Sequence, residues 1–368
     1  MKDGSRFARA GVMDLQPYVP GKPIEEVAAE FGLTEIYKLA SNENPLSMSP
    51  KSAAAVQAEI PNCHFYPEGE SPIVRKKLAK HWGVAENQIC FGTGGDHVLT
   101  LIGNAFINQG DEVIVGAPSF YTYNLSTWMM GGTLVKVPLD ANMCYDLEAI
   151  LAAVTPRTKL IFFCNPNNPT GTIVRREEVA DFMARLPDHC VVVFDEAYFE
   201  FVQDQNYPDG IEEYVKTGAN VIVLRTFSKI YGLAGLRIGY AIAAEHLAPV
   251  LSRVVPPFPV NRLAQAAAAA ALDDTEHLQA VINNNETGRA YLNAEFAKMG
   301  LKFAESHGNF IFVDVEKSAQ EVNQQLLQRG FIIRPGTGWG FPNHIRVSIG
   351  LPEANEKFIA ALKEILQK

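Results

Sequence analysis

The sequence has few cysteines, and they form no recognisable scaffold. Five of them are scattered over 368 residues without a C-x-x-C pair: Cys63, Cys90, Cys144, Cys164 and Cys190. An odd and scattered set in a chain of this length argues against a disulfide framework and against a zinc site. We therefore expect free thiols in a reducing compartment and no bound metal.

Long apolar runs and clustered positive charge are also missing. No stretch of about 20 consecutive apolar residues occurs, so no membrane span is expected, and the polar residues 1–11 contain no signal-peptide core. The formal net charge is −9. Lysines and arginines do not cluster with aromatic residues, as they do in most nucleic-acid-binding surfaces. These absences predict a cytoplasmic protein that binds neither membranes nor nucleic acid.

What the sequence does contain is a series of short apolar segments separated by amphipathic ones. The strand candidates are residues 89–91, 112–115, 134–137, 159–164, 191–194 and 221–224. The segments VVVF and VIVL show no polar alternation, which is typical of strands covered on both faces. Helical patterns such as 96–106 and 175–184 lie between them. Together they predict an α/β fold with a mainly parallel, mixed sheet flanked by helices.

The pattern changes after the proline-rich segment 256–259. A long helical stretch over 274–299 precedes strand candidates at 309–315, 331–333 and 344–349 and a closing helix from residue 353. A chain of 368 residues is long enough for two packed domains. We predict an N-terminal segment (1–40) that packs on the small domain and the cleft, a large domain (41–258) and a smaller α+β domain (259–368).

A lysine follows the last buried strand candidate of the first part. Lys229 ends the segment TFSK (226–229), just after residues 221–224, and burial of a charged ammonium is costly. Such a lysine can reach solvent or pair with an acid. It can instead lose its charge by condensing with an aldehyde.

A carboxylate occupies the end of another strand candidate. Asp195 follows residues 191–194, at the edge where α/β sheets bind ligands. It is open to roles as a helix cap or a metal ligand. Beside a pyridine ring, it would keep the ring nitrogen protonated so that the ring accepts electrons. Tyr198, three residues on, can donate a hydrogen bond to a ligand oxygen or pack as an ordinary aromatic residue.

Two turns complete the pattern, and either can also be a plain turn. The turn 165–171 (NPNNPTG) places Asn165 at a strand end, where its amide can meet a ligand oxygen. The turn 92–97 (GTGGDH) precedes a helix, whose dipole and backbone N–H groups favour an anion. Ser228 and Arg237 are further candidate phosphate partners.

Together, these segments resemble those of the fold-type-I pyridoxal-phosphate aminotransferases. The resemblance covers nearly the whole chain and rests on NPNNPTG, DEAY and SK-x-x-G-L-A-G-L-R-x-G in this order. The segments LQPY (15–18), KLASNENP (38–45) and Tyr66-Pro67 are similar to the histidinol-phosphate aminotransferase branch. The resemblance implies pyridoxal 5'-phosphate as cofactor and a homodimeric transaminase of histidine biosynthesis. Its substrates would be an amino donor and a 2-oxo acid.

The resemblance also implies roles for individual residues. Lys229 would bind the cofactor aldehyde and move the proton, Asp195 would hold the ring nitrogen, and Asn165 and Tyr198 would hold the ring's phenolic oxygen. The implied phosphate contacts are Gly95, Asp96, Thr226, Ser228, Arg237 and, from the neighbouring subunit, Tyr66. The implied substrate contacts are Tyr18, Asn42, Arg334 and Arg346, of which Arg346 would grip a carboxylate or phosphate.

Two positions depart from the family pattern. Phe120, in Pro118-Ser119-Phe120, stands where many relatives carry a ring-stacking tyrosine, so it can stack on the cofactor but cannot donate a hydrogen bond. His97 stands where an acidic residue is common, and we leave it outside the site.

Several alternatives stay open at this point. Within the same fold they are an aromatic amino acid transaminase and a threonine-phosphate decarboxylase. A non-catalytic cofactor-binding regulator would carry a basic DNA-binding domain, which is not recognisable here. A nicotinamide dehydrogenase would carry G-x-G-x-x-G, but His97 occupies its third glycine position.

Overall fold

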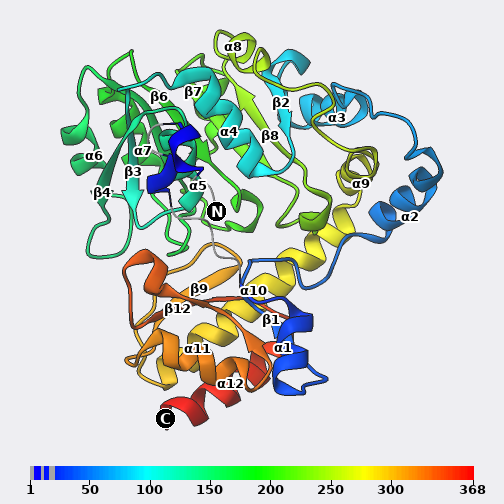
Figure 1. Cartoon of the computed structure of the whole chain (residues 1–368), viewed down its shortest axis with the longest axis vertical. Helices are drawn as coiled ribbons and strands as arrows, with labels where there is room; N and C mark the ends of the chain where they lie inside the picture. Colours follow the sequence, from blue (N-terminus) through cyan, green and yellow to red (C-terminus); the bar gives the residue numbers. More distant parts are fainter. Residues whose placement is uncertain (1–3, 10–11, 16–20) are drawn as a thin grey trace.

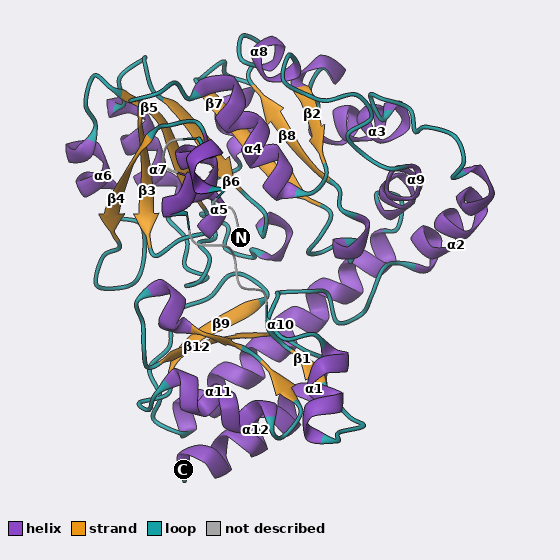
Figure 2. Ribbon diagram, in the orientation of Figure 1, coloured by secondary structure: helices purple, strands orange, loops and turns teal. Residues whose placement is uncertain are grey.

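The computed structural model describes residues 4–9, 12–15 and 21–368 of the chain. Figure 1 shows a larger part, built on one wide sheet, and a smaller part that contains β9, β12, α11 and α12. The long helix α10 (Thr275–Lys298) runs between the two. Figure 2 shows that helices surround the strands in both parts.

Among the described residues, the largest sheet has seven strands in the order β2-β8-β7-β6-β5-β3-β4. They are β2 (Ile89–Gly92), β3 (Glu112–Ala117), β4 (Thr133–Pro138), β5 (Thr158–Cys164), β6 (Val191–Asp195), β7 (Val221–Thr226) and β8 (Gly239–Ala243). Five neighbouring strands (β7, β6, β5, β3 and β4) run parallel to one another. Strand β8 is antiparallel to both of its neighbours, β2 and β7. The predicted mainly parallel, mixed sheet is confirmed, and β8 is a strand absent from the prediction.

Helices pack on this sheet through their apolar faces. α4 (Gly95–Phe106) contacts β2, β7, β8 and α5 (Tyr121–Met129), whereas α6 (Leu147–Ala153) contacts β3, β4 and α7 (Arg176–Arg185). The remaining helices of this part are α2 (Pro50–Glu59), α3 (Pro72–Trp82), α8 (Ala248–Ser252) and α9 (Arg262–Ala271). Phe162 and Phe194, which come from the apolar strand segments, are fully buried in the resulting core.

The smaller part has two short sheets among its described residues. β9 (Phe310–Asp314), β11 (Arg334–Pro335) and β12 (His344–Ser348) form an antiparallel sheet, and β1 (Tyr37–Lys38) pairs in parallel with β10 (Phe331–Ile332). α1 (Ile24–Phe31), α11 (Ala319–Leu327) and α12 (Pro352–Leu366) complete this part. Its buried side chains, such as Phe296 and Phe358, form a hydrophobic cluster separate from the large core. No helix of the described residues has the length and apolar character needed to cross a membrane.

The core of the larger part continues beyond residue 258. Ala264 and Ala268 of α9 belong to the large hydrophobic cluster, and their small side chains allow α9 to approach α2 closely. Val281, in the first half of α10, belongs to the same cluster. The domain limits at 40/41 and 258/259 stay a prediction, and the large core reaches past the second of them.

Candidate active site

A cleft of about 1670 Å³ opens where the parallel strands of the large sheet end. The register pairs Cys164 with Asp195 and Asp195 with Leu224, so the carboxyl ends of β5, β6 and β7 lie side by side. Open α/β sheets place their ligands at this edge. The cleft brings together most of the predicted site residues: Asn42, Gly95, Asp96, Phe120, Asp195, Tyr198, Thr226, Ser228, Lys229, Arg237, Arg334 and Arg346.

Lys229 lies in the loop after β7 and is half-buried in the cleft. Its Nζ donates a hydrogen bond of 2.9 Å to the carbonyl oxygen of Ser41. Burial and, to a smaller extent, the positive charge of Arg346 lower the pKa of Lys229 to about 8. An amine with this pKa is partly neutral near physiological pH, as a nucleophile or base must be.

Asp195 is the last residue of β6 and is 3% exposed. Burial raises the pKa of its carboxyl to about 6, whereas hydrogen bonds from Tyr123 Oη (2.6 Å) and Ala197 N (3.1 Å) oppose that rise. The positive charge of Lys229 also favours the ionised form. Asp195 is therefore a carboxylate at neutral pH, and a donor holds each of its two oxygens.

Tyr123 is a site residue absent from the prediction. It is fully buried in α5, its hydroxyl bonds to Asp195, and its ring stacks on Phe162 with 4.7 Å between centroids. Phe120 lines the cleft at the start of α5 and meets Tyr123 edge-on at 5.8 Å. Because residues three apart lie on the same face of a helix, the spacing from Phe120 was the signal that could have identified Tyr123.

The N-terminus of α4 offers an anion site at the same edge. Gly95 and Asp96 open this helix of 12 residues, and the first N–H groups of a helix have no acceptor within it. Gly94 has a φ of +80°, and a Cβ there would overlap the Arg237 guanidinium. Glycine at this position therefore lets Arg237 lie against the turn.

Two hydroxyls stand beside this turn. Thr226 Oγ1 and Ser228 Oγ are 3.1 Å apart, and both residues line the cleft. The carboxylate of Asp96 already has two partners: it accepts a hydrogen bond of 2.9 Å from Thr122 Oγ1 and pairs with Arg237 at 3.4 Å. The donors together (helix N–H groups, hydroxyls and a guanidinium) fit a phosphate group.

His97, the departure noted in this turn, also lines the cleft. Its Nδ1 accepts a hydrogen bond of 3.0 Å from Thr93 N. The ring therefore closes the glycine turn.

The structure does not place Asn165 in the cleft lining. Both atoms of its amide bond to the backbone of Val174, with Nδ2 donating to the carbonyl and Oδ1 accepting from the N–H, each at 3.0 Å. Asn165 thus closes its own turn, and its side chain is buried outside the cleft lining. Asn168 of the same turn lines the cleft instead, and its Oδ1 accepts a hydrogen bond from Arg346. The strand-end position favoured Asn165, but the turn directs Asn168 toward the site.

Tyr198 is 3% exposed, and its ring centroid lies 5.8 Å from Lys229 Nζ. Its hydroxyl accepts a hydrogen bond of 3.0 Å from Asn42 Nδ2. Asn42 in turn binds Ser348 of β12 twice, through its N–H at 2.8 Å and its Oδ1 at 3.0 Å. This chain of hydrogen bonds connects the large-sheet side of the cleft with the small sheet.

The small sheet contributes two arginines. Arg334 and Arg346 lie opposite each other in the register of β11 and β12, and both line the cleft. Arg346 is 6% exposed, donates to Ala40 O at 2.6 Å, and lies 5.2 Å from the ring centroid of Trp339. The result is a fixed guanidinium at the edge of the cleft.

Besides Asn165, two predicted site residues are not among those that the structure brings together. Tyr66 does not line this chain's cleft; its side chain is 80% exposed and stacks on Phe258 with 4.9 Å between centroids. Tyr18 lies outside the described residues. Within the part of the chain that the structure describes, no three Cys, His, Asp or Glu side chains gather as metal ligands would.

Comparisons with known proteins agree with this geometry. Residues 34–362 match the family described as aminotransferase class I and II. Histidinol-phosphate aminotransferases of Moorella thermoacetica and Caldicellulosiruptor saccharolyticus are each 46% identical to 97% of this chain, covering 92% and 99% of their own lengths. The crystal structure of histidinol-phosphate aminotransferase from Sinorhizobium meliloti in complex with pyridoxal-5'-phosphate has a TM-score of 0.88 and 30% identity, covering 98% of this chain and 97% of that one. The chain belongs to the class I and II aminotransferase family.

Proposed function

We propose that the protein is a pyridoxal-phosphate-dependent aminotransferase that transfers the amino group of L-histidinol phosphate to 2-oxoglutarate. The products are imidazole acetol phosphate and L-glutamate, which places the enzyme in histidine biosynthesis. The proposal is carried by the position of Lys229 and Asp195 in one cleft, at the ends of neighbouring parallel strands. Relatives that are 46% identical over nearly the whole chain bear the name histidinol-phosphate aminotransferase, which supports the substrate.

The donors of the cleft fit pyridoxal 5'-phosphate. The N-terminus of α4, Ser228 and Arg237 would hold its phosphate, Lys229 its aldehyde carbon and Asp195 its ring nitrogen. Phe120 is available to stack on the ring. When bound, this cofactor supplies an aldehyde that takes up the amino group and a cationic ring that accepts electrons.

Lys229 is the group that moves the proton. With a pKa of about 8, it takes a proton from the substrate α-carbon as a neutral amine and returns one as an ammonium near neutral pH. Asp195, held by Tyr123 and by the Ala197 N–H, presents its negative charge to the ring nitrogen. Tyr198 and Asn168 would contact the phenolic oxygen of the ring. We assign that second contact to Asn168 in place of Asn165, because Asn168 lines the cleft.

Arg346 would bind the anionic group of each substrate in turn. A guanidinium presents several N–H donors in a plane and pairs with either a carboxylate or a phosphate. One site can therefore accept glutamate and a phosphorylated amine. Arg334, opposite Arg346 in the sheet register, is positioned to assist. Asn42, which bonds to both Ser348 and Tyr198, would orient the substrate.

We also propose a cytoplasmic homodimer in which Tyr66 reaches the neighbouring active site. Ile60, Phe65 and Tyr66, which lie between α2 and α3, and Ile73, in the first turn of α3, are all more than half exposed. Exposed apolar side chains on one segment are typical of a surface that another protein covers. The five free cysteines fit a reducing compartment.

A donor panel tests the substrate. Protein loaded with pyridoxal 5'-phosphate should be assayed with histidinol phosphate, phenylalanine, tyrosine and threonine phosphate, each against 2-oxoglutarate. We expect kcat/KM for histidinol phosphate to exceed the other values at least about tenfold, with ping-pong kinetics. Equal rates on all donors would contradict the substrate assignment. Release of carbon dioxide from threonine phosphate without an amino acceptor would identify a decarboxylase.

A further inference from the structure

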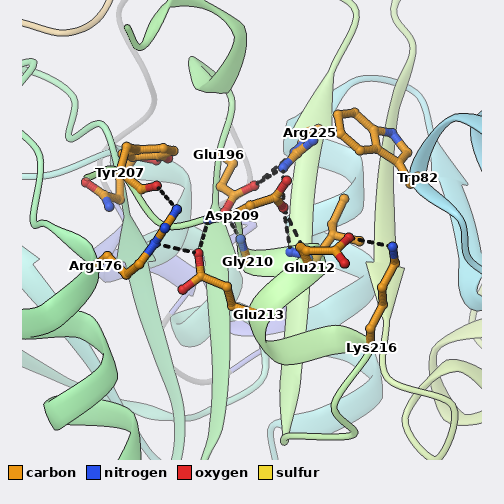
Figure 3. Close-up of polar contacts among 12 residues, drawn as sticks. Trp82, Arg176, Glu196, Tyr207, Asp209, Gly210, Glu212, Glu213, Lys216 and Arg225 are labelled. Carbon is orange, nitrogen blue, oxygen red and sulfur yellow. Dashed lines mark hydrogen bonds and ion pairs between the residues drawn. The ribbon is translucent and has the colours of Figure 1, made fainter. Parts of the chain in front are cut away.

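A buried ion pair joins the ends of β6 and β7 outside the cleft lining. Arg225 Nε and NH2 donate to Glu196 Oε2 at 2.9 and 2.6 Å, and the two side chains are 0% and 1% exposed. Arg225 NH2 also donates to Asp209 Oδ1 at 3.2 Å, and Gly210 N donates to Glu196 Oε1 at 2.9 Å. Figure 3 shows these side chains converging. We call Arg225, Glu196, Asp209 and Gly210 the strand-end cluster.

Two aromatic rings enclose the guanidinium of the strand-end cluster. The Arg225 Cζ lies 4.0 Å from the ring centroid of Trp82 and 3.5 Å from that of Phe199. Trp82 is in turn held by a hydrogen bond of 3.2 Å from Nε1 to the Tyr240 hydroxyl. The plane of an arginine can stack in this way, whereas a lysine ammonium cannot reproduce it.

The same loop reaches a third strand end. Tyr207, two residues before Asp209, donates its hydroxyl proton to the carbonyl oxygen of Asn165, the residue that follows β5. The loop 207–210 therefore contacts the ends of β5, β6 and β7 at once, from residues that do not line the cleft.

Stability alone is a weak explanation for this arrangement. Removing two charges from water costs several kcal/mol per ion, and replacing a buried ion pair with apolar residues is often neutral or stabilising. A buried pair does, however, impose a specific geometry on the backbone that carries it. The strand-end cluster is therefore better explained by the backbone geometry that it holds in place.

The members of the cluster are chain neighbours of the groups that act in the cleft. Glu196 follows Asp195, and Arg225 precedes Thr226 and stands four residues before Lys229. Phe199, one of the two rings that enclose Arg225, follows Tyr198. Adjacent side chains of a strand point to opposite faces, so a displacement of one moves the backbone of the other. Glu196 N also donates to Leu224 O at 2.9 Å, directly between the two strand ends.

We propose that the strand-end cluster is a positioning device that sets the distance between Asp195 and Lys229, the two groups on either side of the cofactor ring. This inference rests on the proposed function, because it assigns the cluster a role through that ring. Arg225 and Glu196 touch neither cofactor nor substrate. They act by holding the ends of β6 and β7 in one register, so that the carboxylate and the amine meet the same ring.

Two variants test the cluster. Arg225→Lys keeps the charge and loses the planar fork. The double variant Arg225→Met with Glu196→Gln removes both charges, keeps similar volume, and keeps an acceptor for Gly210 N. We expect both to fold and to bind pyridoxal 5'-phosphate. In each, kcat should fall at least about tenfold with KM within about twofold, because misplacement of about 1 Å costs up to about 100-fold in rate.

A spectroscopic readout separates positioning from a merely structural role. With the cofactor bound through Lys229, the visible absorbance would change with pH, and the midpoint of that change would depend on how the charges around the ring are placed. We expect this midpoint to move by about half a pH unit or more in both variants. The melting temperature of the double variant should stay within about 5 °C of the parent.

Arg157→Met is the matched control. Arg157 lies just before β5 and pairs with Glu112, the first residue of β3, at the edge of the same sheet that is farthest from the cleft. The side chain of Arg157 is 73% exposed. This variant should keep the parent's kcat and absorbance midpoint. Variants of the cluster that match the parent in both readouts would overturn the proposal. So would loss of folding in both, because the cluster would then be a folding element only. A parent protein that forms no visible chromophore would instead refute the proposed function.

Discussion

The two walls of the cleft are built in different ways. The large-sheet wall carries Asp195 and Lys229 at the ends of adjacent strands, where one backbone register sets their spacing. On the small-sheet wall, Arg346 is held by Ala40 and Asn168, which come from distant segments of the chain. A wall fixed by a single sheet provides a constant geometry for a resident cofactor, whereas the position of Arg346 depends on contacts from several segments of the chain.

The walls also differ in their electrostatics. Burial moves the pKa of Lys229 down to about 8 and that of Asp195 up to about 6, so both groups titrate near neutral pH. The small-sheet wall carries arginines, which keep their charge at any physiological pH. On the proposed function, proton transfer would belong to the large-sheet wall, and binding of the substrate's anionic group would belong to the small-sheet wall.

Lys229→Ala should lower kcat at least about 10⁴-fold, because it removes both the amine that binds the cofactor and the base that moves the proton. The phosphate contacts of α4, Ser228 and Arg237 remain, so the variant should still bind pyridoxal 5'-phosphate non-covalently. Borohydride should fix the cofactor to the parent and not to the variant, as mass spectrometry of the peptide would show. If the variant catalysed transamination at the parent's rate, the proposed mechanism would be wrong.

Arg346→Lys should weaken substrate binding at the small-sheet wall while leaving the large-sheet wall intact. Loss of the planar fork should lower kcat/KM about 10- to 100-fold, mainly through KM, since hydrogen bonds to charged groups contribute about 1.5–3 kcal/mol. The lysine keeps a positive charge near Lys229, so the absorbance of the bound cofactor and its pH midpoint should stay close to those of the parent. A moved midpoint with an unchanged KM would contradict the division between the walls.

The capture of pyridoxal 5'-phosphate by the apoenzyme should depend on pH with a midpoint near 8. Only the neutral amine attacks the aldehyde, so the second-order rate constant should fall about tenfold per pH unit below that midpoint and level off above it. A lysine with its usual pKa of 10.5 would show a rate that still rises at pH 10. Stopped-flow absorbance measures the rate constant, with a lysine derivative in solution as the reference.

The sequence predicted the large-sheet wall better than the small-sheet wall, for a physical reason. Residues such as Asp195 follow uninterrupted apolar strands, and the carboxyl ends of parallel strands necessarily meet at one edge. No local pattern states that Asn42 binds Ser348, which is 306 residues away. The roles of the small-sheet arginines came from resemblance alone.

The errors on the large-sheet wall concern side-chain direction. Asn165 and Asn168 share one turn, and composition alone does not tell which amide the turn uses for its own backbone. Strand β8 was missed because Gly239–Ala243 lacks the β-branched run of VVVF or VIVL. Tyr123 was missed because it lies inside α5, at no strand end or glycine turn, and only its spacing from Phe120 indicates the site.

Tyr123→Phe should have the smallest effect of these substitutions. It tests whether the large-sheet wall extends from the strand ends into α5. The hydroxyl donates to Asp195 and lowers the pKa of that carboxyl, so its loss should raise the pKa further and favour the neutral acid at low pH. Because the Ala197 N–H still binds the carboxylate, we expect kcat to fall by only about 2- to 10-fold, which corresponds to about 0.5–1.5 kcal/mol. The acid limb of the kcat profile should move to higher pH, while KM stays unchanged.

Tyr145→Phe supplies the control for this variant. Tyr145 is also a buried tyrosine, but its hydroxyl bonds to Ser119 Oγ at 2.9 Å and accepts from Cys164 N at 3.3 Å, without touching Asp195. It should leave the acid limb in place. If both variants move that limb equally, general loosening of the core would explain the shift. A shift confined to Tyr123→Phe would instead extend the proton-transfer wall from the strand ends into α5.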